Sequence, residues 1–131
     1  MARPPDRRPW VTRKRFHGIV AEALDAIPPE LARHLENVAV VVEDGPDDDV
    51  LCDLGLDPRR DSLYGLYQGT PIGERADLHD GLPDRIVIYY LPLSEDFTDE
   101  YHLRREIRRT VIHEVGHFFG LDDDRLGEMG Y

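Results

Sequence analysis

The stretch HEVGHFFGLDDD, residues 113–124, constrains the fold of this chain more than any other feature. The segment from about Thr98 to Phe119 predicts a helix, with Thr98 as its N-cap and Gly120 as its left-handed stop. Its apolar residues recur every three or four positions and form one face, made of Leu103, Ile107, Val111, Val115 and Phe118. Residues 113 and 117 differ by about 40° in direction around such a helix. Both imidazoles are therefore expected on one face, one turn apart and away from the core.

Two histidines presented in this way form a preset pair of zinc ligands. Glu114 projects about 100° from His113 and about 60° from His117, beside the metal position, where a general base would stand. A zinc ion with three protein ligands keeps its fourth position for water, and an adjacent carboxylate takes the proton as hydroxide attacks a carbonyl.

The third ligand has to come from outside the helix. A sharp turn at Gly120 can return a residue a few positions later to the metal, and Asp123 stands where the extended HExxHxxGxxH pattern has its third histidine. The motif here is HExxHxxGxxD. Aspartate is a legitimate zinc ligand, but its charge makes the metal a weaker Lewis acid than three imidazoles would. The alternative is a solvated polar face, with residues 122–124 capping the next turn.

The rest of the chain predicts helices and three or four strands. Residues 16–27 show the spacing of an amphipathic helix that ends at Pro28 and Pro29. The further elements, in chain order, are a short helix in PPELARHLE, a strand NVAVVVE (37–43), a loop DGPDDD (44–49), a strand SLYGLYQGTP (62–71), a polar loop (72–84) and a strand RIVIYYLPL (85–93).

Composition limits the classes of partner. The chain has 131 residues, 40% of them hydrophobic, which suits one domain with a modest core. Its net charge is −11, but residues 1–15 carry six of the sixteen basic residues and one of the 27 acidic ones. We therefore expect a flexible basic arm over residues 1–15 and one domain over residues 16–131. An acidic domain repels nucleic acid, and no apolar run is long enough to span a membrane. The lack of a signal-like segment and the single Cys52 favour a cytoplasmic location. For the oligomeric state, we slightly favour a monomer.

At the HExxHxxGxxD motif the sequence resembles the small bacterial zincin-like metallopeptidases, or minimal metalloproteases. The resemblance covers most of the chain after residue 15, through ALDAIPPELA, VAVVVED, LYGLYQGTPIGER, LPDRIVIYY and REIRRTVIHEVGHFFGLDDDRLGEMGY. It implies a compact α+β fold in which a three- to four-stranded mixed sheet packs on the active-site helix. It also implies that His113, His117 and Asp123 bind Zn²⁺ and that Glu114 is the base.

Three functions fit these patterns. The first is a zinc metallopeptidase acting on peptides or unstructured protein segments. The second is a zincin-like metal-binding protein without useful peptidase activity, serving as a regulatory or interaction module. The third is a non-haem iron enzyme, because two histidines and a carboxylate also form the iron facial triad, although that chemistry has no required role for Glu114.

Several further residues could have a function, but their positions in the sequence do not assign one. His79, Tyr67 and Tyr131 could each donate a hydrogen bond to an oxyanion, yet loop exposure for His79 and aromatic packing for the tyrosines are the simpler interpretations. Met129 follows Asp123 too closely to assign as the methionine turn of metzincins. Either LYGLYQG or RIVIYYL could form the sheet edge along which a peptide substrate lies.

Overall fold

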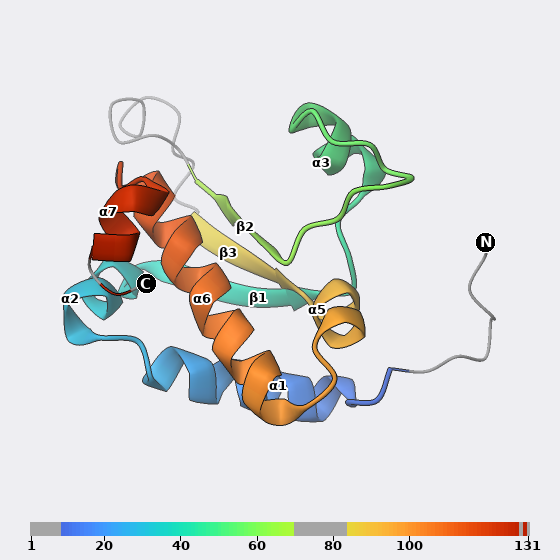
Figure 1. The fold of residues 1–131 in the computed structure, drawn as a ribbon, viewed down its shortest axis with the longest axis horizontal. Helices are drawn as coiled ribbons and strands as arrows, with labels where there is room; N and C mark the ends of the chain where they lie inside the picture. Colours follow the sequence, from blue (N-terminus) through green and yellow to red (C-terminus); the bar gives the residue numbers. More distant parts are fainter. Residues whose placement is uncertain (1–8, 70–83, 129, 131) are drawn as a thin grey trace.

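The structure, a computed structural model, describes residues 9–69, 84–128 and 130. Of Asp123, within the second range, it describes the backbone but not the side chain. Figure 1 shows helices and strands in one α+β unit. In chain order the elements are α1 (Arg13–Asp25), α2 (Pro29–Ala32), the 3-10 helix η1 (Arg33–Leu35), β1 (Val38–Glu43), α3 (Asp48–Asp53), β2 (Gly65–Gln68), β3 (Asp84–Tyr89), α5 (Tyr90–Asp96), α6 (Glu100–Phe118) and α7 (Asp123–Glu128). In these described ranges, no helix is both long and apolar enough to cross a bilayer.

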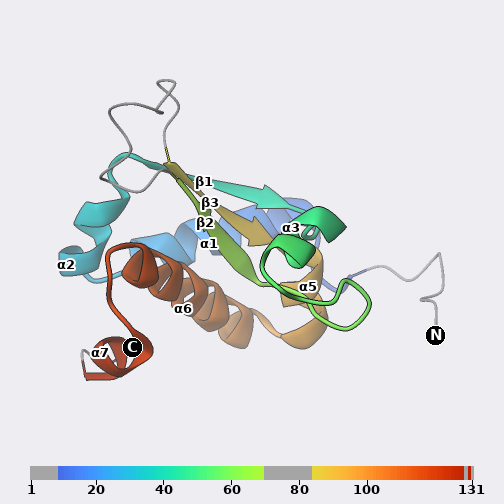
Figure 2. The same ribbon diagram turned by 90° about the horizontal axis from the view of Figure 1, so that it is seen from above.

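The strands form a mixed sheet in the order β1-β3-β2. β1 runs parallel to β3, with Val38 opposite Asp84, and β2 runs antiparallel to it, with Gly65 opposite Ile88. The predicted α+β fold with a mixed sheet is therefore confirmed. The segment RIVIYY supplies the central strand, so within the described sheet β1 and β2 are the edges (Figure 2).

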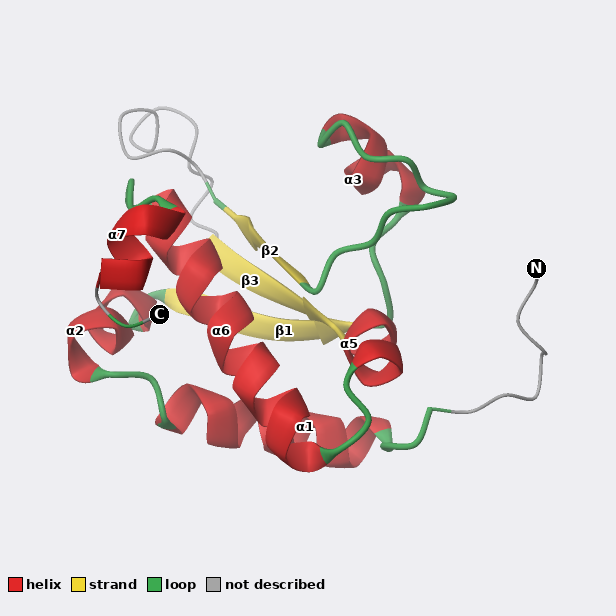
Figure 3. Cartoon of the chain, in the orientation of Figure 1, coloured by secondary structure: helices red, strands yellow, loops and turns green. Residues whose placement is uncertain are grey.

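One hydrophobic core joins the helices to the sheet. In Figure 3, α6 crosses in front of the sheet and α1 lies beneath it. The predicted apolar face of α6 is confirmed for Leu103, Ile107, Val111 and Val115, which are all buried, whereas Phe118 is only partly buried. The core cluster also includes Phe16, Ile19, Val20 and Ala23 of α1, and Ile86 and Ile88 of β3.

The central strand is buried on both faces. Ile86 and Ile88 belong to the core between sheet and helices, and successive side chains alternate between faces. Val87 and Tyr89 on the opposite face are also buried, with exposed fractions of 0% and 1%. This double burial explains why the segment reads as a continuous apolar run.

The N-terminus of α6 differs from the prediction, whereas its C-terminus agrees with it. Its N-cap is Asp99 and not Thr98, because the extended Asp99 accepts a hydrogen bond from the His102 backbone N–H at 2.9 Å. At the C-terminus, Gly120 has a φ of 84°, as expected for a left-handed stop. The Gly120 N–H donates to His117 O at 3.1 Å and the Leu121 N–H donates to Gly116 O at 2.7 Å, the two bonds of a Schellman motif.

The first turn of α6 predicts a loss of stability in acid. Hydrogen bonds from His102 lower the pKa of Asp99, and a hydrogen bond from the Arg15 side chain lowers that of Glu100. A carboxyl whose pKa is depressed by folding stabilises the fold above its unfolded pKa of about 4, and this stabilisation is lost as pH falls through the folded pKa. Urea unfolding should therefore give a free energy of unfolding that declines from about pH 5 downwards.

The matched variant is Asp99→Asn, which keeps a cap oxygen but cannot titrate. Its decline in acid is expected to be shallower than that of the wild type. Parallel pH profiles for the two proteins would show that the cap carboxylate contributes nothing to acid sensitivity.

Two predicted segments were wrong in part. The acidic loop 44–49 gives way to α3 at Asp48, because acidic residues in the first turn favour the positive end of a helix. The strand predicted over residues 85–93 ends at Tyr89, and α5 follows at once. Pro92 lies in the first turn of α5, where its missing N–H would have no helical partner in any case. Residues 70–83, which include most of the predicted polar loop, lie outside the described part.

The packed region begins before residue 16. Val11 is buried, and the Trp10 indole N–H is shared between the carbonyl oxygens of Ser94 and Phe97, both at 3.0 Å. Thr12 caps α1, which starts at Arg13. Residues 9–15 are thus part of the fold, and what is left of the predicted arm, residues 1–8, lies outside the described part.

Candidate metal centre

His113 and His117 lie on one side of α6, off its buried face. Their ring centroids are 5.9 Å apart with an angle of 87° between the rings. His113 is partly buried and His117 is exposed. Two imidazoles on one tetrahedral zinc have centroids about 5 Å apart, given zinc–nitrogen distances of about 2.0–2.1 Å. The observed separation of 5.9 Å is slightly longer than this value.

Glu114 points from α6 to the outer edge of the sheet. Its Oε1 accepts a hydrogen bond of 2.9 Å from the backbone N–H of Tyr67 in β2. The two residues are 47 positions apart in the chain, so this contact depends on the tertiary fold. The predicted base is therefore held against the edge strand, one residue from a predicted metal ligand.

A groove of about 410 Å³ runs between α6 and the start of β2. His113 and Glu114 both line it, so two of the four predicted site residues border one space. Its other lining residues are Ser62, Leu63, Tyr64, Gly65, Glu106, Arg109 and Thr110. At Gly65 the strand approaches α6 so closely that a Cβ would stand 2.6 Å from Thr110 Cγ2. The glycine inside the predicted strand was the sequence signal of this close approach.

Tyr64 is a groove residue that the sequence analysis did not single out. Its hydroxyl donates a hydrogen bond to Asp96, and its ring meets Phe97 edge-on at 5.5 Å. Burial, followed by the neighbouring Asp96 carboxylate, raises the pKa of Tyr64 to about 12. Tyr64 therefore stays protonated at neutral pH, and its partner is a carboxylate of α5.

The chain reverses after α6 as predicted, and α7 packs back on it. Leu126 is fully buried, and a Cβ added at Gly116 would stand 2.9 Å from its side chain. Gly116, inside the HEVGH motif, thus permits the close packing of α7 beside His117. Asp123 begins α7, but its side chain lies outside the described part.

The described residues contain no cluster of three or more metal-ligating side chains. They include His113 and His117 but not the side chain of Asp123, so the described set holds two of the three predicted ligands. The chemistry of this pair suits zinc, and Asp123 stays a prediction as the third ligand.

Of the residues considered for oxyanion binding, only Tyr67 is described. Its ring stacks on Phe118 with centroids 4.1 Å apart, and its hydroxyl donates to Asp84 Oδ2 at 2.8 Å. Aromatic packing therefore accounts for Tyr67. His79, Tyr131 and Met129 lie outside the described residues.

Comparisons with known proteins agree with this geometry. The family of zincin-like metallopeptidases matches residues 35–131, a range that contains the sheet and the HExxH helix. The chain is also similar to the solved structure of a conserved hypothetical protein from Thermus thermophilus, with 22% identity and a TM-score of 0.55 over 90% of this chain and 99% of that one. At this identity the likeness shows the fold alone. None of the curated proteins compared with the chain matches it. The match over residues 35–131 shows that the chain belongs to the zincin-like metallopeptidase family.

Proposed function

We propose that the protein is a zinc-dependent metallopeptidase that hydrolyses peptides or unstructured protein segments, with Glu114 as general base. The observation that carries the proposal is that His113 and Glu114 border one groove beside an edge strand. Membership of the family supports the same chemistry. We also propose a cytoplasmic location, on the single cysteine alone.

Each residue has a distinct task in this proposal. Zinc, held by His113, His117 and Asp123, supplies Lewis-acid activation of the scissile carbonyl and of water. The Glu114 carboxylate takes a proton from the attacking water and gives it to the leaving amine. Because Glu114 reaches the groove from α6 and the substrate lies on the strand opposite, the base and the scissile bond share one space.

The edge strand β2 explains why the substrate should be extended. The Tyr89 N–H donates to Tyr64 O at 2.9 Å, which marks the hydrogen-bonded pairs of the antiparallel ladder. By alternation, Leu66 and Gln68 direct their backbone groups to β3, whereas Gly65 and Tyr67 direct theirs outwards. A peptide in extended form can pair with these outward groups, but a folded domain cannot. Of the two segments considered for this edge, LYGLYQG is favoured because RIVIYYL is central.

Metal removal tests the proposal. We expect the protein to hydrolyse unstructured casein, to lose this activity after treatment with a chelator, and to regain it with added zinc but not with magnesium, which prefers octahedral oxygen sites. The products are measured by mass spectrometry of the released peptides. If the protein binds zinc but never cleaves casein or a peptide library, it is the metal-binding module without peptidase activity.

A further inference from the structure

We infer that Tyr67 is a positioning residue for Glu114, and that its backbone N–H holds one oxygen of the carboxylate while the other is left to move the proton. The inference rests on the proposed function for the role of Glu114. Its structural basis is the 2.9 Å hydrogen bond from the Tyr67 N–H to Glu114 Oε1. No metal ligand takes part in this contact.

The strand register shows why this N–H is available to Glu114. Tyr67 lies opposite Ile86 in a pair whose backbone groups do not bond across the ladder, because the neighbouring pairs of Leu66 with Val87 and Gln68 with Arg85 do. The Tyr67 N–H thus faces out from the edge of the sheet. An outward N–H on an edge strand needs a partner, and the carboxylate of α6 supplies it.

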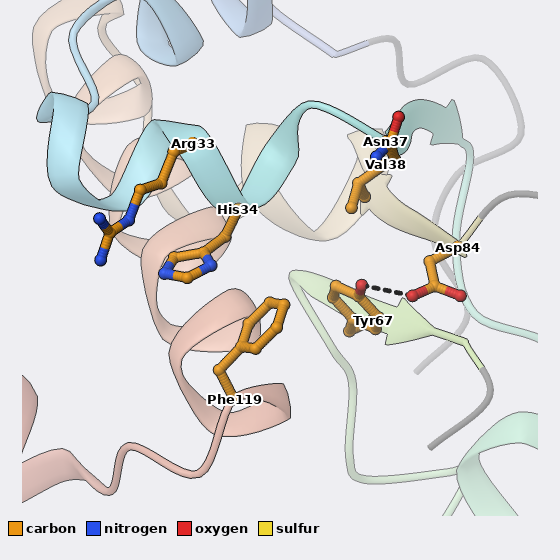
Figure 4. A pocket seen from close by; sticks show the side chains of 7 residues that line it. All are labelled: Arg33, His34, Asn37, Val38, Tyr67, Asp84 and Phe119. Atoms are coloured by element: carbon orange, nitrogen blue, oxygen red, sulfur yellow. Dashed lines mark hydrogen bonds between the residues drawn. The ribbon is translucent and has the colours of Figure 1, made fainter. Parts of the chain in front are cut away.

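Two contacts hold the Tyr67 side chain in place. Its ring stacks on Phe118, which lies on the same helix as Glu114 and one turn further on, with an interplanar angle of 19°. Its hydroxyl donates to Asp84, the first residue of β3, as Figure 4 shows. Asp84 is itself buried, with 5% of its surface exposed. The Tyr67 side chain is therefore tied to α6 and to the central strand at once, and these contacts keep the Tyr67 N–H beside Glu114.

A donor held beside the carboxylate has a chemical consequence for a general base. A glutamate has three side-chain torsions, and a free carboxylate samples many directions. With Oε1 held by the strand, the carboxylate samples fewer directions, and Oε2 is the oxygen left to take and return a proton. Catalytic groups act best when such contacts hold them close to the productive geometry. The same bond also takes one of the outward donors of β2, which leaves the substrate the Tyr67 carbonyl and the Gly65 groups.

Amide hydrogen exchange tests the contact without any need for hydrolysis. In uniformly labelled zinc-loaded protein, we expect Glu114→Ala to raise the exchange rate of the Tyr67 amide by about tenfold or more, since the carboxylate that accepts its hydrogen bond is removed. The outward Gly65 amide should not change. The matched control is Glu106→Ala, on the same helix and groove, which should leave the Tyr67 amide unchanged. An unaltered Tyr67 rate in Glu114→Ala overturns the inference.

Kinetics then separate positioning from packing. Tyr67→Ala and Tyr67→Pro both lose the ring and the hydroxyl, but only proline loses the N–H, and proline is tolerated on an edge strand whose N–H faces outwards. We expect kcat of Tyr67→Pro to be about tenfold or more below that of Tyr67→Ala. The two variants should have the same KM and the same zinc content. Equal kcat values in two folded variants overturn the inference. If the proline variant does not fold, the exchange experiment decides. If the wild type cleaves nothing, the proposed function is wrong, but the exchange result still tests the contact between Tyr67 and Glu114.

Discussion

Glu114→Gln is expected to lower kcat for peptide hydrolysis by about 10² to 10⁴-fold, the usual contribution of a positioned general base. The amide has nearly the shape of the carboxylate but cannot accept a proton at neutral pH. Its carbonyl oxygen can still accept the hydrogen bond from the Tyr67 N–H, so the groove should keep its form. Rates on casein and on a peptide substrate, measured with zinc-loaded protein, check this expectation.

The effect of Glu114→Gln should be confined to kcat. Zinc content and melting temperature are expected to match those of the wild type, because the substituted side chain is not a predicted ligand. The control is Glu128→Gln on α7, an exposed residue that pairs with Arg125 at 3.2 Å and should leave kcat unchanged. If Glu114→Gln retains full activity, another group is the base, and the assignment of Glu114 is wrong.

Gly65→Ala is expected to destabilise the fold by about 1–3 kcal/mol, the usual cost of forcing extra volume into a packed region. A Cβ at this position would lie 2.6 Å from Thr110 Cγ2 and 3.0 Å from the Val87 carbonyl oxygen. The threonine can rotate away, but the carbonyl belongs to the central strand and cannot. β2 must therefore move from α6 or distort its ladder. Urea unfolding followed by circular dichroism measures the change.

Gly45→Ala provides the control for Gly65→Ala. No atom lies within 4 Å of a Cβ added at Gly45, so its free energy of unfolding should change little. Because β2 carries the Tyr67 N–H, Gly65→Ala should also disturb the groove in the protein that is still folded. Equal stabilities for the two variants would show that β2 does not pack on α6 as described.

The helix that carries the motif was predictable because its signals are local. The spacing of Leu103, Ile107, Val111 and Val115 sets the buried face, and the same spacing turns the histidines out of the core. Gly120 was equally plain, since a left-handed residue favours glycine. The cap at Asp99 was missed by one position because Thr98 and Asp99 are both good N-caps, and only the tertiary structure chooses between them.

The rest depends on contacts between distant residues. Pro92 is the local sign in RIVIYYLPL that the strand ends early, but it does not place the end at Tyr89, and Tyr90 and Leu93 are buried in α5 as they could be in a strand. The strand order, with β3 in the centre, follows from pairing across long separations. The bond between Glu114 and Tyr67 is of the same kind, and no spacing in the sequence indicated it.

Elemental analysis of purified protein after dialysis tests the central claim, that His113, His117 and Asp123 hold one zinc ion. The wild type should contain one zinc per chain, and both His113→Ala and Asp123→Ala should lose it. The control is His102→Ala, on the same helix but exposed and bonded to Asp99 at 2.7 Å, which should keep its zinc. Undiminished zinc in His113→Ala would contradict the account, because the metal would then be held elsewhere.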